Sequence, residues 1–167
     1  MCAASNVPPE ILPSKDAARE EAWREKQQTK TKEDPAVDHT IVHFEIPADD
    51  PERAAKFYRE LFGWEIQKWS LEGGPDYWMV ATVPTDGKGQ TLRPGVNGGL
   101  IGRRHPGHLP TNYIGVENLD EYARKARRLG AEEVTPKTPV KGMGWYAWLK
   151  DPEGNVFGIW QTDEKVA

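Results

Sequence analysis

Apolar and polar positions alternate in two different ways from residue 38 onward. The stretch IVHFEI alternates with a period of two, which predicts a half-buried β-strand. The residues after it follow a helical period, with one apolar stripe formed by Ala54, Tyr58, Leu61 and Phe62. Asp50 followed by Pro51 is a favourable helix start, and Gly63 is a favourable helix end. The pattern therefore predicts a strand followed by a helix that ends before Gly63.

Three more strands follow the first helix and complete a unit. Their sequences are WEIQKWS, DYWMVATV and a short segment around GGLIGR, which is reached through the Gly- and Pro-rich stretch PTDGKGQTLRPG. In the short segment, the pair Gly98-Gly99 permits a close approach of another group to the backbone. The predicted unit is β-α-β-β-β.

The same order of elements recurs in the second half of the chain. TNYIGV predicts a strand, and the helix after it stops at Gly130. The apolar face of that helix consists of Leu119, Tyr122, Ala123, Ala126 and Leu129. The segments EEVTPK, GWYAWLK and NVFGIWQ then predict three strands. Aligning Gly63 with Gly130 brings the two first strands nearly into register, which indicates an internal duplication.

The repetition predicts an α+β fold with two βαβββ modules in tandem, residues 38–104 and 109–162. Each module is too small to be stable alone, so the two are expected to form one curled, mixed or antiparallel sheet around a shared cavity. The whole domain would span residues 38–166. Residues 1–37 are a charged extension, predicted to be partly helical or disordered, in which Trp23 is a candidate for docking on a partner subunit.

Composition and charge narrow the range of partners. The net charge is −4 and the basic residues are dispersed among acidic ones, so nucleic acid is not expected as a partner. The single cysteine, Cys2, allows no internal disulfide and no cysteine-based zinc site, which fits a reducing compartment. The chain shows neither a signal-peptide pattern nor a long apolar run, so no membrane span is expected. The expected location is cytoplasmic.

The first strand contains a pair of candidate catalytic residues, His43 and Glu45. Residues two apart on a strand share a face at a spacing of about 6.6 Å, so these side chains can lean together. By the same spacing His39 lies about 13 Å from His43, too far to share a metal ion. His43 and Glu45 are interpreted either as an acid/base pair or as a hydrogen-bonded polar pair that faces a cavity.

Aromatic residues are abundant, with seven Trp, five Tyr and four Phe. If the sheet curls, about half of the aromatic residues on strands face inward, where they suit a small, flat or apolar ligand. The candidates for ligand contact are Trp78, Tyr113, Trp145 and Trp148. The alternative is that these rings pack against the helices as core. The other two histidines, in HPGH at residues 105–108, are interpreted as part of a solvated loop.

The stretches HFEIPADDPERAAKFYRELFGWE, NYIGVENLDE and GMGWYAWLKDPEGNVFGIWQ together resemble the vicinal oxygen chelate superfamily, over residues 38–162. This superfamily includes glyoxalase I, extradiol dioxygenases, methylmalonyl-CoA epimerase, and the bleomycin and fosfomycin resistance proteins. The resemblance implies the fold of two βαβββ modules. It leaves the chemistry open, because one scaffold serves several functions in this superfamily.

The resemblance also implies where metal ligands would lie. The ligand of the first strand corresponds to His43, which is kept. The equivalent positions of the second module correspond to Thr111 and Gly158, which are poor metal ligands, and GGLIGRR in module one carries no carboxylate. The resemblance therefore implies no metal-dependent glyoxalase I chemistry and no extradiol cleavage. No cofactor is expected, with a divalent metal held by His43 and Glu45 as the alternative.

Three functions are compatible with these residues. The first is the binding of a small aromatic or hydrophobic molecule, with contacts assigned to Trp78, Tyr113, Trp145, Trp148 and Thr111. The second is a lyase-, isomerase- or dioxygenase-like enzyme that uses His43 and Glu45 as acid and base or as residual metal ligands. The third is an interaction protein that binds its partner through residues 1–37. Exposed sheet edges also favour a homodimer.

Overall fold

The structure is a computed structural model, and it describes residues 19–21, 24, 37–70, 75–87 and 89–167. The chain divides into two units, Met1–Ala36 and Val37–Ala167. In the first unit residues 19–21 and 24 are helical, and Arg24 Nη2 donates to Glu20 Oε1 at 2.7 Å. Trp23 lies outside the described residues, so its predicted role stays a prediction.

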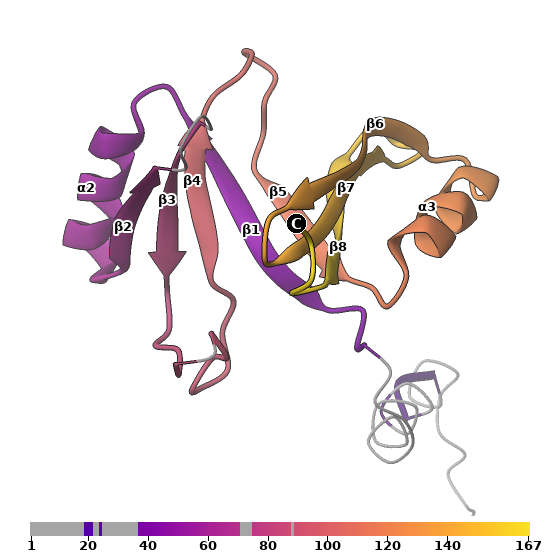
Figure 1. Ribbon diagram of the computed structural model, residues 1–167, viewed down its shortest axis with the longest axis horizontal. Coiled ribbons are helices and arrows are strands. Elements are labelled where there is room, and N and C mark those ends of the chain that lie inside the picture. The colour runs from indigo at the N-terminus through magenta and orange to yellow at the C-terminus, as the bar shows by residue number, and fades with distance from the viewer. Residues whose placement is uncertain (1–18, 22–23, 25–36, 71–74, 88) are drawn as a thin grey trace, which may run out of the picture. The chain divides into compact units, whose positions relative to one another are not determined.

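The second unit contains two modules with the same order of elements (Figure 1). Module one consists of β1 (Ile41–Ala48), α2 (Pro51–Phe62), β2 (Glu65–Ser70), β3 (Asp76–Ala81) and β4 (Gly98–Gly102). Module two consists of β5 (Thr111–Gly115), α3 (Leu119–Arg128), β6 (Glu132–Val140), β7 (Gly144–Lys150) and β8 (Val156–Thr162). The predicted α+β fold with two βαβββ modules is confirmed.

All eight strands form one mixed sheet in the order β2-β3-β4-β1-β5-β8-β7-β6. Within each module the first and last strands pair in parallel, β1 with β4 and β5 with β8. The two modules join through the antiparallel pair β1 and β5 at the centre of the sheet. The sheet is curled and does not close, because β2 and β6 remain its two edges (Figure 1).

Both helices of the second unit begin with a side-chain cap. Asp50 Oδ1 accepts from the Arg53 backbone N–H at 3.0 Å, and Pro51 occupies the first turn of α2. Asn118 Oδ1 does the same for the Glu121 N–H at 3.1 Å in α3. Gly63 ends α2 in the left-handed region, with φ 67°. None of the helices in the described part of the chain is long and apolar enough to cross a membrane.

The apolar stripe predicted for α2 is correct only in its first half. Ala54 and Tyr58 pack against the core together with the fully buried Ala55. Leu61 and Phe62 are exposed, in contrast to the prediction. They belong to the last turn of the helix, where the Phe62 ring stacks on Tyr58 instead of entering the core. Helical periodicity therefore located the buried face but not the point where the sheet beneath it ends.

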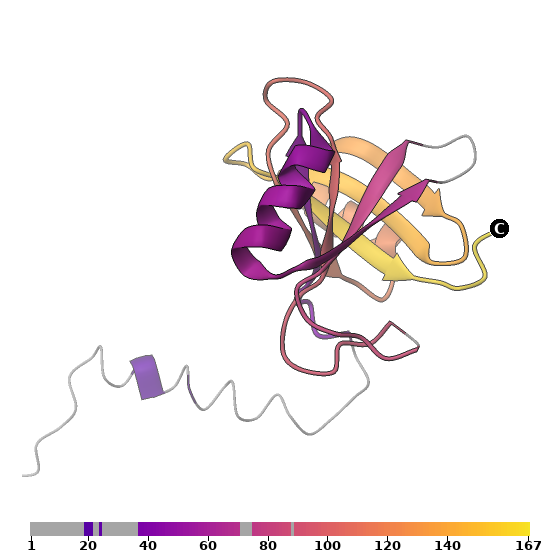
Figure 2. The ribbon, with the colours of Figure 1, turned by 90° about the vertical axis from the view of Figure 1, so that its left-hand side faces the viewer.

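The helix α2 lies against one face of module one (Figure 2), and α3 packs against the strands of module two. The core between α2 and module one contains Ala55, Ile66, Trp78, Val80 and Leu100. The core between α3 and module two contains Val116, Leu119, Ala123, Ala147, Leu149 and Ile159. The residues that alternate with these along the strands lie on the other face, which we call the helix-free face.

Candidate functional site

The pairing of β1 with β5 brings the two predicted catalytic residues next to module two. His43 lies opposite Tyr113 and Glu45 lies opposite Thr111, and all four side chains are on the helix-free face. On the other side of β1, Glu45 lies opposite Gly99 of β4. On the other side of β5, Tyr113 lies opposite Gly158 of β8.

Five side chains from four strands form a hydrogen-bonded group on this face, which we call the central cluster. Its members are His43, Glu45, Tyr77, Tyr113 and Trp148. The Tyr113 hydroxyl donates to Glu45 Oε2 at 2.6 Å and accepts from Trp148 Nε1–H at 2.6 Å. The Tyr77 hydroxyl lies 2.7 Å from His43 Nε2 and also hydrogen-bonds to Glu45. Glu45 is therefore held from both sides by tyrosines, one from each module.

Two glycines make room for the tyrosine rings of the central cluster. A Cβ atom added at Gly158 would overlap the Tyr113 ring, and one added at Gly99 would overlap the Tyr77 hydroxyl. The sequence suggested a close approach at Gly98-Gly99, and the structure identifies Tyr77 as the approaching group. Gly158, which the resemblance placed at a metal-ligand position, has the same role for Tyr113.

Burial shifts the proton equilibria of the central cluster. Removal from water lowers the pKa of His43 to about 4, so its imidazole is neutral at neutral pH. Burial raises the pKa of Glu45, although the hydrogen bond from Tyr113 and the charge of Arg104 oppose that shift. Burial also raises the pKa values of the Tyr77 and Tyr113 hydroxyls. The site thus contains a carboxyl that exchanges protons more readily at neutral pH than an exposed one does, and a neutral base beside it.

The predicted aromatic ligand contacts divide between the two faces. Tyr113 and Trp148 lie on the helix-free face in the central cluster. Trp78 belongs to the core beneath α2 and donates its indole N–H to Glu52 Oε1 at 3.0 Å. Trp145 packs against the core beneath α3. The structure therefore brings Tyr113 and Trp148 together with Glu45 and places Trp78 and Trp145 on the opposite face.

Thr111 lies where the resemblance placed it, beside Glu45 at the centre of the sheet. Its side chain is buried and its hydroxyl donates to the Leu109 carbonyl at 3.4 Å. Among the described residues, Thr111 makes no hydrogen bond to the central cluster.

His39 does not share a face with His43, in contrast to the predicted alternation. A β-bulge between Ile41 and His43 shifts the register of β1 against β5 by one residue. His39 consequently lies on the α3 side, with its ring 4.9 Å from Tyr122 and its Nε2 3.3 Å from Glu117 Oε2. The bulge separates the two histidines, and no alternation pattern in the sequence reveals it.

The interpretation of HPGH as a solvated loop is wrong for one of its histidines. His108 is buried, its ring lies 5.8 Å from the Trp148 ring, and its Nδ1 accepts the Arg104 backbone N–H at 3.3 Å. The neighbouring His105 is exposed. A single buried side chain inside a Pro- and Gly-rich connection leaves no periodic signal, so sequence patterns could not find it.

Sequence reasoning also missed the role of Tyr77. Tyr77 and Trp78 are adjacent on β3, and one of them must face the helix while the other faces away. Trp78 and Val80 alternate with Tyr77 and Met79 along the strand. Both pairs are largely apolar, so the sequence does not decide which pair is buried. The contact of Tyr77 with Gly99 across β3 and β4 decides it in the structure.

The donor set of the central cluster does not fit a divalent metal centre. In the described residues, no three His, Cys, Asp or Glu side chains come together in a group that could hold a metal ion. The resemblance assigns two further ligands to positions 111 and 158. Thr111 supplies only a buried hydroxyl there, and Gly158 has no side chain. His43 Nε2 and Glu45 Oε2 already have tyrosine hydrogen-bond partners. No chemical step is therefore derived through a metal here.

Comparisons with known proteins agree with this fold. The sequence profile of the Glyoxalase/Bleomycin resistance protein/Dioxygenase superfamily matches residues 40–159. The structure is similar to the methylmalonyl-CoA epimerase of Mycobacterium tuberculosis, with a TM-score of 0.58 and 13% sequence identity, over 82% of this chain and 97% of that one. It is also similar to a methylmalonyl-CoA epimerase in complex with methylmalonyl-CoA and NH4+, with a TM-score of 0.56 and 17% identity, over 76% and 96% of the two chains.

A curated sequence relative is the Mycobacterium bovis protein named "Putative glyoxylase CFP32". The two sequences are 24% identical over 124 residues, which is 73% of this chain. The match spans 45% of the relative, so this chain covers about half of that protein's length.

Proposed function

The chain belongs to the Glyoxalase/Bleomycin resistance protein/Dioxygenase superfamily, and on that basis we propose that it binds a small aromatic or hydrophobic organic molecule on the helix-free face. The observation that carries this proposal is the central cluster, where the rings of Tyr77 and Tyr113 lie over Gly99 and Gly158. The face offers aromatic surface around one carboxyl group, and a small number of polar groups in an apolar surround is typical of small-molecule sites.

Exposed apolar surface next to the central cluster supports this proposal. Trp69 is 46% exposed and Met79 is 38% exposed, although both lie on strands of the sheet. Trp69 lies opposite Tyr77 on the helix-free face, and Met79 lies two residues from Tyr77 on the same strand. A planar ligand placed against these two side chains would bury them and lie beside Tyr77.

Glu45 is the group best placed to orient such a ligand. Its Oε2 is occupied by Tyr113, and burial favours the protonated form of its carboxyl. A protonated carboxyl offers one O–H donor as well as acceptor capacity, so it can pair with a carbonyl or an amide of the ligand. Selectivity would then come from one buried polar contact inside an aromatic surround.

The proposal is tested with a panel of single-ring and two-ring aromatic compounds that includes indole and benzoate. Binding is measured by NMR titration, and mass spectrometry checks that the compound is recovered unchanged. A Trp69→Ala variant is expected to weaken binding about fivefold or more, which corresponds to about 1 kcal/mol for a truncated contact. Phe57→Ala is the matched control, since Phe57 is a similarly exposed ring on α2. Equal losses in both variants, or no binding by any compound, would contradict the proposal.

A second candidate function is acid/base catalysis without a metal. The hydrogen-bonded series Glu45, Tyr77 and His43 favours it, because a carboxyl of raised pKa is linked through a hydroxyl to a neutral imidazole. Solved relatives of this fold include methylmalonyl-CoA epimerases, one of them in complex with methylmalonyl-CoA. Glu45 would take a proton from an acidic C–H group of the substrate and return it to the same carbon, and the Tyr77 hydroxyl, which is hydrogen-bonded to the neutral His43, would orient the carboxyl.

This second function is tested by incubating the protein with methylmalonyl-CoA in D2O and measuring deuterium at the acidic carbon by mass spectrometry. Catalysed exchange that is lost in Glu45→Gln, and kept in the exposed-surface variant Glu60→Gln, would establish it. Exchange at the same rate with and without the protein would rule out this substrate as a proton donor.

Two further expectations are proposals of the same kind. The strands β2 and β6 are the edges of the sheet, and we propose that a second copy of the chain covers one of them. Light scattering that reports a monomer at all concentrations would contradict the homodimer. The cytoplasmic location stays a prediction.

A further inference from the structure

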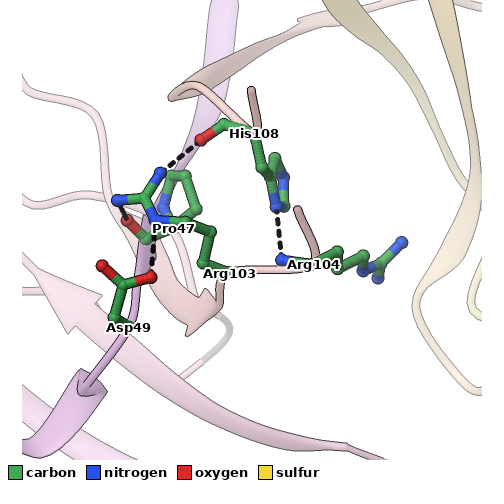
Figure 3. Close-up of polar contacts among 5 residues, drawn as sticks. All are labelled: Pro47, Asp49, Arg103, Arg104 and His108. Atoms are coloured by element: carbon green, nitrogen blue, oxygen red, sulfur yellow. Dashed lines mark hydrogen bonds and ion pairs between the residues drawn. The ribbon is translucent and has the colours of Figure 1, made fainter. Parts of the chain in front are cut away.

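Two adjacent arginines at the end of β4 have different environments. Arg103 uses its whole guanidinium to hold the connection between β4 and β5 (Figure 3). Its Nε donates to Asp49 Oδ1 at 2.9 Å, its Nη1 to the His108 carbonyl at 2.6 Å, and its Nη2 to the Pro47 carbonyl at 3.0 Å. The Arg103 charge is balanced by Asp49, and its donors are used, so Arg103 has a structural role.

Arg104 keeps its donors free. Its backbone N–H donates to His108 Nδ1 at 3.3 Å, which fixes where the side chain starts. Figure 3 shows that the guanidinium points away from Arg103 and Asp49. The Arg104 Cζ lies 5.0 Å from the centroid of the Trp148 ring. Among the residues that the structure places, no hydrogen bond or ion pair reaches this guanidinium.

The surface around these residues is hollowed. A depression of about 560 Å³ is lined by Asp49, Arg103, Arg104, His105 and Pro106. Asp49 supplies the one acidic side chain of that lining, and its charge is paired with Arg103. Arg104 therefore gives the depression a surplus of positive charge, and His105 adds an exposed imidazole whose ring is stacked 5.5 Å from His108.

The depression adjoins the central cluster through Trp148. The Arg104 guanidinium lies over the Trp148 ring. The Trp148 indole N–H donates to the Tyr113 hydroxyl, which donates to Glu45. We propose that Arg104, supported by His105, binds an oxyanion, a carboxylate or a phosphate, and that the ligand of the helix-free face is an organic anion. The second half of this proposal rests on the proposed function, whereas the oxyanion site itself does not.

The chemistry of the guanidinium supports this assignment. A planar guanidinium presents paired N–H donors that match the two oxygens of a carboxylate or phosphate. The contact with the Trp148 ring restrains the Arg104 guanidinium before an anion binds, which lowers the entropy cost of binding. The charge of Arg104 also reaches Glu45, so an anion bound at Arg104 would weaken that effect on the central cluster.

The oxyanion site is tested by titrating inorganic phosphate into the ¹⁵N-labelled full chain. We expect saturable shifts of the Arg104 Nε–H and of the backbone amides of residues 104–107, and their loss in Arg104→Gln. Lys68→Gln is the matched control, because Lys68 Nζ also stands 5.0 Å from a tryptophan ring, that of Trp78 on the other face. Potassium chloride at the same ionic strength must not reproduce the shifts. Non-saturable shifts in the wild type, or equal shifts in Arg104→Gln, would overturn the site.

The ligand class is tested with benzoate and benzamide, which differ in charge but hardly in shape. We expect benzoate to bind about tenfold or more tightly in the wild type, as one charge-assisted contact allows, and the two to bind equally in Arg104→Gln. Equal binding in the wild type would overturn the anionic ligand class. If phosphate binds at Arg104 while neither aromatic compound binds, the proposed function fails and the oxyanion site stands.

Discussion

The two modules share a scaffold but carry different side chains on the helix-free face. Module one contributes His43, Glu45 and Tyr77, which include an imidazole and a carboxyl group. Module two contributes Tyr113 and Trp148. The Trp148 indole N–H donates to the Tyr113 hydroxyl, and this hydroxyl donates to Glu45. Both modules have the same order of elements, and the helix of each begins with a side-chain N-cap.

Exposure follows the same division. Tyr113 and Trp148 are 5% and 8% exposed, whereas Trp69 and Met79 of module one are open to solvent. One copy of the duplicated unit therefore carries the titratable groups His43 and Glu45 next to exposed apolar side chains, and the other copy supplies the buried support that orients them. A duplicated fold allows this because the centre of the sheet is built from both copies at once.

The largest effect is expected at the two glycines of the sheet centre. Gly158→Ala forces the rigid Tyr113 ring away and breaks its bonds to Glu45 and Trp148, so we expect a loss of about 4 kcal/mol in the free energy of unfolding. Gly99→Ala meets the outer end of Tyr77, which can swing away, so about 1–2 kcal/mol is expected. Urea denaturation measures both values.

Gly102→Ala is the control for this pair. Gly102 lies at the end of β4, and no heavy atom stands within 4 Å of an added Cβ. A change within about 0.5 kcal/mol is expected there. Equal losses in the free energy of unfolding for Gly158→Ala and Gly99→Ala would contradict the difference in burial between the two modules.

The second effect is a pH dependence that comes from module one. His43 stays neutral in the folded chain because burial lowers its pKa to about 4, whereas the unfolded chain binds a proton below about 6.5. Stability should therefore fall by about 2–3 kcal/mol as the pH falls from 6.5 to 4. Glu45 has the opposite effect on stability because its pKa is higher in the folded chain than in the unfolded chain. The stability that it contributes is lost as the pH rises above the pKa of Glu45 in the unfolded chain.

Urea midpoints measured between pH 4 and pH 7 check this expectation. His43→Gln should flatten the acid side of the profile, and the slope that remains comes from His108, whose pKa burial also lowers. Glu45→Gln should remove the decrease in stability that the raised pKa of Glu45 causes as the pH rises. An unchanged profile in His43→Gln would show that this imidazole is protonated in the folded chain.

The third effect compares the two tyrosine hydroxyls. Tyr113→Phe leaves the buried Trp148 N–H without its acceptor and removes one of the two tyrosine donors of Glu45, so a loss of about 2 kcal/mol is expected. Tyr77→Phe removes the partner of His43 at a more accessible place, and about 1 kcal/mol is expected. Thermal unfolding at pH 7 ranks the two variants. A larger loss for Tyr77→Phe would assign the supporting role to module one.

The smallest effect is expected where the modules are alike. Asp50→Ala and Asn118→Ala each remove one N-cap hydrogen bond, at 3.0 Å and 3.1 Å. Each should cost about 1 kcal/mol. Urea denaturation of the two variants should give values that agree within the error of the method, because the scaffold has not diverged. A large difference would place part of the divergence in the helices.

Local signals in the sequence were sufficient for the scaffold. Asp50, Pro51 and Gly63 set the limits of α2 through caps that act within one turn. Strand alternation and the repeated order of elements predicted the two modules. These features depend on neighbouring residues, which a sequence displays directly.

The candidate site was predicted only in part. His43 and Glu45 were found, since they lie two residues apart on one strand. Tyr77 and Arg104 were not found, because their roles depend on contacts across β4 and across the connection before β5. Trp78 and Trp145 were assigned to the ligand without knowledge of which strand face the helices cover. Non-local packing decided each of these cases.

The most direct test of the central claim is the response of individual tryptophans to indole. The ¹⁵N spectrum of the chain resolves indole N–H signals, and Trp→Phe variants assign them. Trp69 and Trp148 lie on the helix-free face, and Trp78 and Trp145 lie on the helix-covered face. Saturable shifts of Trp69 and Trp148, with Trp78 and Trp145 unchanged, are the predicted result. Shifts confined to Trp78 and Trp145, or no shift at all, would contradict a ligand site on the helix-free face.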